Sequence, residues 1–239
     1  SGKSITGNIS NEATGAENTG LGRGAGRDLT TGQRNILIGH EAGSLLTTGS
    51  YNVFIYAQSS SASNPKTGNL NVVIGYNAGK MLTSGERNTF IASDAGSATT
   101  TGRDNIAVGQ AAMQNNTIGG GNTYLGAFSG TESGTGNNNL AAGRSALFRN
   151  TDGSGNVALG REAALGVSGK GQSPNNITVI GFQAGYSQNG LNGVLFAGMH
   201  AGYHATNMHD SVLLGRASGF NLTTGNDNVM VGAATGDNE

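Results

Sequence analysis

The sequence predicts an all-β protein, a parallel β-solenoid (β-roll) of about 13 coils with a 17-residue repeat that associates with copies of itself. Three observations lead to this fold: a glycine that recurs at a fixed interval, several repeat positions that keep one residue type, and a long apolar stripe. The whole chain, 1–239, is expected to form one repeat domain, with 1–7 as a lead-in or tag remnant.

The composition excludes several other classes of protein. Gly makes up 43 of 239 residues, but only two Pro are present, whereas collagen needs Gly at every third position and abundant Pro. The net charge of −1 gives no electrostatic footprint for nucleic acid or an anionic membrane. The absence of Cys excludes disulfides and thiolate metal sites, and no apolar run is long enough to span a membrane. No signal peptide is recognisable.

The repeat is defined by the residue that ends each short apolar segment, which we number position 0. Ten of the twelve intervals between these residues are 17 residues long, one is 19 and one is 21. The series is Gly22, Gly39, Tyr56, Gly75, Ala92, Gly109, Gly126, Gly143, Gly160, Gly181, Gly198, Gly215 and Gly232.

Each repeat contains the signals of one solenoid coil. Position −4 is Asn in ten of thirteen repeats, position +3 is always small, and position +4 is Gly in nine. We expect a short strand, a tight turn at Gly, a second weaker strand, and a turn rich in Thr, Gly and Asn. Stacked Asn side chains are expected to form an amide ladder, as in cross-β stacks. Strands about 4.8 Å apart then give a rod roughly 60 Å long.

Side chains alternate across a strand, so the repeat positions divide between two faces. Positions −1 and −3 are almost entirely apolar and are predicted to fill the interior of each coil. Position −2 then points outward and forms an apolar stripe too long for a soluble monomer, which predicts a homo-oligomer that buries it. The alternative is a flat solenoid that tolerates surface apolar residues. The large members of the stripe, predicted to lie at the subunit interface, are Leu37, Phe54, Val73, Phe90, Phe196, Leu213 and Met230.

Units such as Asn71-Val-Val-Ile-Gly75 and Asn156-Val-Ala-Leu-Gly160 resemble the head repeats of trimeric autotransporter adhesins and the repeats of phage tail fibres. The likeness runs from about Asn8 to Gly236. It implies a homotrimer of left-handed β-rolls that mediates attachment. The 17-residue unit and the Ala-Gly after the strand depart from the autotransporter pattern, so the tail-fibre branch is favoured. The implied role is a stiff extracellular stem on a virion that binds a host polysaccharide or outer-membrane receptor, with a bacterial surface adhesin as alternative.

The last residues agree with this branch. The chain stops at Asp237-Asn238-Glu239, just beyond a repeat. Many tail fibres lose a C-terminal chaperone by self-cleavage, so such an end resembles a mature product; an expression boundary explains it equally well.

The sequence offers no catalytic, metal or cofactor site. The Gly-Lys-Ser at 2–4 lacks the glycine-rich loop of a nucleotide-binding site. The acidic residues are scattered at one or none per coil, whereas glycan cleavage needs two carboxylates about 5 to 10 Å apart. A glycan-cleaving fibre, with a carboxylate pair formed between chains, is the alternative. A metal held by His200, His204 and His209 and an ice-binding Thr array are weaker ones.

Receptor binding is assigned to the two insertions and to an aromatic column. The 19- and 21-residue repeats hold the only two prolines and are expected to bulge out as loops at 59–66 and 166–174. A neutral insertion is the alternative. The aromatic residues at position +5 of late repeats could stack on sugars or fill a wider core. The residues assigned to receptor binding are Asn64, Lys66, Lys170, Gln172, Tyr186 and Tyr203.

Overall fold

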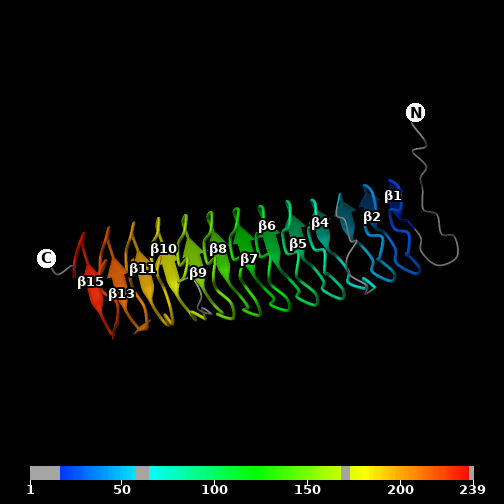
Figure 1. Cartoon of the computed structure of the whole chain (residues 1–239). Helices are drawn as coiled ribbons and strands as arrows, with labels where there is room; N and C mark the ends of the chain where they lie inside the picture. The colour runs from blue at the N-terminus through cyan, green and yellow to red at the C-terminus, as the bar shows by residue number, and fades with distance from the viewer. Residues whose placement is uncertain (1–16, 57–64, 168–172, 237–239) are drawn as a thin grey trace, which may run out of the picture.

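The computed structural model describes residues 17–56, 65–167 and 173–236, and within these ranges the chain is all-β with no helix. It is a parallel β-solenoid whose main sheet has thirteen strands stacked side by side along a rod (Figure 1). The strands of this sheet are β1 (Thr19–Leu21), β2 (Ile36–Ile38), β3 (Val53–Ile55), β4 (Val72–Ile74), β5 (Thr89–Ile91), β6 (Ile106–Val108), β7 (Thr123–Leu125), β8 (Leu140–Ala142), β9 (Val157–Leu159), β10 (Thr178–Ile180), β11 (Leu195–Ala197), β13 (Val212–Leu214) and β15 (Val229–Val231).

The predicted register is confirmed. Each strand pairs in parallel with the equivalent residues of the next, so that Ile38 lies beside Ile55 and Ile55 beside Ile74. The two longer repeats keep this register, because β3 pairs with β4 and β9 with β10 at matching positions. The extra residues therefore leave the register of the sheet unchanged. Most of both insertions, 57–64 and 168–172, lies outside the described residues.

The second weaker strand expected in every coil is replaced by turns. Positions +2 and +4 have positive φ, as at Glu41 (55°) and Gly43 (58°). Backbone bonds from this segment alternate between the same coil and the next one, for example Ala42 N to Gly39 O and Gly26 N to Ala42 O. An extended strand cannot contain left-handed residues at alternate positions. A second two-stranded sheet appears only near the C-terminal end of the described chain, between β12 (Met208–His209) and β14 (Gly225–Asn226).

The predicted inward and outward faces of the strand are reversed in the structure. In the main sheet, the middle residue of each strand from β2 to β13, at position −2, is buried inside the coil of its own chain, whereas positions −1 and −3 are half-buried or exposed. Leu37, Phe90 and Phe196 are each 0% exposed in a single chain. The alternation was predicted correctly, but the interior is the face that we had assigned to the subunit interface.

The Asn ladder explains why position −2 is inside. Asn52 Nδ2 donates to Asn35 Oδ1 in the preceding coil (3.1 Å) and to Gly68 O across its own coil (3.0 Å). The same pattern repeats from Asn18 to Asn156, and these side chains are 0–3% exposed. The carbonyls that accept these bonds belong to buried glycines three residues before the Asn of the next coil, so the position −4 side chains point into the coil. Position −2, two residues further along the strand, then points inward as well.

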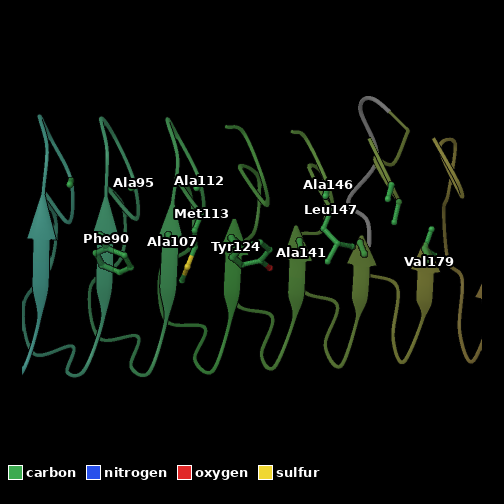
Figure 2. Packing of buried hydrophobic residues seen from close by; sticks show 14 of the residues in the cluster. Phe90, Ala95, Ala107, Ala112, Met113, Tyr124, Ala141, Ala146, Leu147 and Val179 are labelled. Carbon is green, nitrogen blue, oxygen red and sulfur yellow. The ribbon is translucent and has the colours of Figure 1, made fainter. Parts of the chain in front are cut away.

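The narrow interior is filled by complementary volumes at positions −2 and +4. Where position −2 is Phe90, position +4 is Gly96, and a Cβ there would lie 2.6 Å from a ring carbon of Phe90. In the next coil position −2 is Ala107 and position +4 is Met113, whose side chain lies beside Ala107 (Figure 2). Ala141 is matched by Leu147 in the same way. Most coils therefore reach close packing with one large side chain at this pair of positions, whereas the coil of β9 has Ala158 and Ala164 there.

Candidate binding and assembly surfaces

The outer face of the main sheet carries two continuous apolar rows. Every residue at position −1 is apolar, and position −3 is Val, Ile or Leu in nine coils and Thr in four. Several of these side chains are well exposed, among them Ile36 (42%), Ile106 (41%) and Leu125 (40%). We call these two rows the outer face. A patch that spans all thirteen strands is at the upper end of what a soluble monomer usually exposes.

Near each end of the rod, charged side chains stand at both margins of the outer face. Position −5 supplies Glu17 and Asp210 on one margin, and position +1 supplies Arg23 and Arg216 on the other, all exposed. Glu17 and Arg23 belong to the first coil, and Asp210 and Arg216 to the twelfth. Opposite charges therefore lie at the same level on opposite margins. An apolar centre with a polar rim is the usual anatomy of a protein–protein interface.

The seven residues predicted to form the interface do not lie on this surface. Six of them are 0–2% exposed within one chain and belong to a single hydrophobic core, and the seventh, Met230, packs against that core at the last strand. The isolated chain already buries six of these side chains, so they have no exposed surface that a partner could cover. The residues that could do so are their sequence neighbours at positions −1 and −3.

Lys66, predicted to contact a receptor, points into the solenoid. It is 2% exposed, and its Nζ donates to Leu82 O (2.7 Å), Lys80 O (3.1 Å) and Gly79 O (3.4 Å) in the next coil. Burial lowers the pKa of this ammonium to about 7. Its backbone pairs with Leu46, so it occupies the site of a core leucine. Lys66 is therefore structural, while Asn64, Lys170 and Gln172 lie outside the described residues.

Tyr186 and Tyr203 belong to a stack of half-buried rings on the side of the rod. The ring centroids of Tyr186 and Tyr203 are 4.9 Å apart with an interplanar angle of 5°, and those of Tyr203 and Phe220 are 4.9 Å apart at 13°. His200 and His204 meet the edges of Tyr203 at 80° and 82°. Both faces of Tyr203 are thus covered by protein, which leaves no face for a sugar to stack on.

Along the same side of the rod, across the coils of β4, β5 and β6, the surface opens into a groove of about 290 Å³. We call it the side groove. Its position +5 residues are polar, whereas later coils place large apolar residues there. This site was not predicted from the sequence, although the change of residue type at position +5 was its signal. The lining residues are Asn77, Lys80, Met81, Asp94, Ser97, Ala98 and Gln114.

Several carboxylates of the described residues form ion pairs with neighbouring basic side chains. Glu17 contacts Arg34 at 2.6 Å, Asp104 contacts Arg87 at 2.6 Å, and Glu162 contacts Arg161 at 3.0 Å. Gln183 donates to Glu162 (2.7 Å), which holds the pKa of that carboxyl below its ordinary value. Within residues 17–56, 65–167 and 173–236, no group of three or more His, Asp or Glu could hold a metal ion.

Fold and surfaces together define a β-solenoid repeat protein with an apolar sheet face. No protein-family model, curated protein or solved structure matches the chain. The part of the chain that the structure describes contains no helix long and apolar enough to cross a membrane.

Proposed function

We propose that this chain is the structural and adhesive domain of a phage tail fibre, a stiff homotrimeric stem on the outside of the virion that binds a host-surface receptor such as a glycan. The repeat units that resemble tail-fibre repeats support the class of protein. The observation that carries the proposal is the outer face, two apolar rows that run the full length of a thirteen-stranded rod.

A second and a third copy of this chain are the occupants that fit the outer face. The face is as long as the rod itself, about 60 Å, and a three-residue strand is about 10 Å wide. The flat area is then roughly 600 Å² per chain, close to the ~800 Å² that each partner contributes to a standard interface. A globular partner would contact only part of so long and narrow a strip, whereas an identical rod matches its full length.

Charge at the margins favours parallel chains around a common axis. When parallel copies are related by rotation, the margin of one chain meets the opposite margin of its neighbour at the same level. Arg216 then meets Asp210, and Arg23 meets Glu17, which Arg34 of its own chain also contacts. An antiparallel pair would bring the first coil against the last and lose this match. Three sheets that face one axis bury all three outer faces in closed symmetry.

The oligomer is tested by measuring the mass of the unmodified protein by sedimentation. We expect three times the chain mass of 23.9 kDa. Ile106→Asp places a charge on the outer face and should shift the mass to the monomer, because an unpaired charge cannot be buried at an interface. Ile118, 56% exposed and away from the strand, is the matched control, and Ile118→Asp should keep the trimer. A monodisperse, folded monomer of the unmodified chain would refute the proposal.

A further inference from the structure

We propose that the side groove is a binding site for a neutral oligosaccharide that runs along the rod. The site is distinct from every residue assigned to receptor binding from the sequence. The choice of a glycan as ligand rests on the proposed adhesive function, whereas the location of the site rests on the geometry of three successive coils.

The walls of the side groove are held by backbone hydrogen bonds. We call the two rows of lining residues its walls: position +2 supplies Asn77 and Asp94, and position +5 supplies Lys80, Ser97 and Gln114. Within a coil the turn fixes the two walls relative to each other, because Lys80 N donates to Asn77 O (3.2 Å) and Ser97 N to Asp94 O (3.3 Å). The site is therefore formed before any ligand binds, which lowers the entropy cost of binding.

Contacts between coils align the walls along the rod. Asn77 Nδ2 donates to Asp94 Oδ1 (3.1 Å), and Ser93 Oγ donates to Asp94 Oδ2 (2.7 Å), so the Asp94 carboxylate is held in place. On the other wall, Met81 N donates to Ser97 O and Ala98 N to Gln114 O, both at 2.9 Å. Equivalent positions repeat at each coil, which suits a polymer whose units also repeat.

The lining chemistry matches a neutral polyhydroxylated ligand. Lys80 and Asp94 cancel in charge, and the amides of Asn77 and Gln114 supply both donors and acceptors. Sugar hydroxyls donate and accept, so they can satisfy this mixed set. Met81, 38% exposed, offers an apolar surface for the C–H face of a sugar ring. A phosphate or a polyamine would meet a repelling group for each attracting one.

The groove stays open because position +5 is short or polar in these coils. In the later coils the same position holds Phe148, Leu165, Tyr186, Tyr203 and Phe220. The rings of Tyr186, Tyr203 and Phe220 stack on each other at the equivalent place. A large residue at position +5 is thus compatible with the fold, which provides a way to close the side groove without disturbing the solenoid.

The test uses the intact chain on a glycan microarray printed with neutral and anionic bacterial oligosaccharides, followed by titration calorimetry with the glycan that binds best. Ser97→Phe fills the groove with a residue that position +5 already accepts and should weaken binding at least about tenfold. Gln114→Ala keeps the groove open but removes an amide and should also weaken binding. Thr117→Phe is the matched control. Thr117 is exposed, lies in the coil of Gln114 and does not line the groove, so this variant should bind like the unmodified protein.

The outcomes separate this inference from the proposed function. Glycan binding that survives in folded Ser97→Phe and Gln114→Ala would overturn the site while leaving the adhesive function intact. Binding to no glycan, or only to anionic glycans with a steep dependence on salt, would overturn the neutral ligand. Sedimentation of the same samples tests the trimeric stem independently. A monomer that still binds glycan through the groove would refute the trimer and leave the binding site standing.

Discussion

The complementary volumes at positions −2 and +4 give the sharpest test of the packing. Phe90→Ala removes a ring that is 0% exposed and should lower the free energy of unfolding by about 3–5 kcal/mol. Gly96→Met alone inserts a Cβ 2.6 Å from a ring carbon of Phe90, so overpacking should cost about 1–3 kcal/mol, with about 1 kcal/mol more for a left-handed side chain. The double variant reproduces Ala107 with Met113, which the next coil already accepts, and should recover about 3 kcal/mol of the summed loss.

The measurement is chemical unfolding followed by circular dichroism for the unmodified protein, both single variants and the double variant. We expect a coupling of about 3 kcal/mol, since the two side chains share one volume. The same two substitutions made in separate coils, Phe90→Ala with Gly202→Met, serve as the control and should be additive or worse. Additive losses in the double variant within one coil would show that the volumes are not exchangeable and would refute the packing argument.

Three further predictions follow from named contacts. Asn88→Ala breaks the ladder to both neighbouring coils and leaves buried amide and carbonyl groups unpaired, so thermal unfolding should report a loss of about 2–4 kcal/mol. Lys66 binds fewer protons in the folded than in the unfolded chain between about pH 7 and its ordinary pKa of 10.5, so stability should rise with pH across that window. Lys66→Leu should abolish this rise and be more stable at pH 7 by about 1–4 kcal/mol; an unchanged pH profile would contradict the burial of the ammonium. Tyr203→Ala should cost about 1–3 kcal/mol because both ring faces are stacked, and near-ultraviolet circular dichroism should show the loss of the stack.

The sequence predicted the coil, its period and its register, because each depends on a local rule that every repeat obeys. A 17-residue spacing with Gly at the end of the strand can only stack like on like, and Ile38, Ile55 and Ile74 do so. The Asn ladder followed from the same argument. The period, the register and the ladder do not depend on the path that the chain takes between one strand and the next.

The sequence did not settle which strand face is inside, since both faces are apolar and alternation alone does not label them. Two signals in the sequence could have decided it. Position −4 has the same parity as position −2, so a ladder inside the coil places Phe90 inside as well. Large residues at position −2 also occur with Gly at position +4, as in Phe90 with Gly96, while Ala107 occurs with Met113. Such compensation is expected only between side chains that share a core.

The binding residues were harder to predict because exposure is a property of the assembled coil. Lys66 follows a proline in a longer repeat and was taken for a loop residue, yet its backbone pairs with Leu46 and its ammonium lies among carbonyls of the next coil. The side groove combines residues from three coils, and only the turn geometry shows that positions +2 and +5 face each other.

The sequence by itself therefore determined a rod of stacked parallel strands. In a strict repeat each coil contacts only its neighbours, so the constant spacing fixes which residues pair. The tertiary structure decided which face is core and which is the outer face, and it alone showed that Lys66 is buried and where a groove remains. The physical reason is that burial depends on the segment that closes each coil. Its left-handed turns at positions +2 and +4 place the far wall against position −2 and leave positions −1 and −3 on the outside.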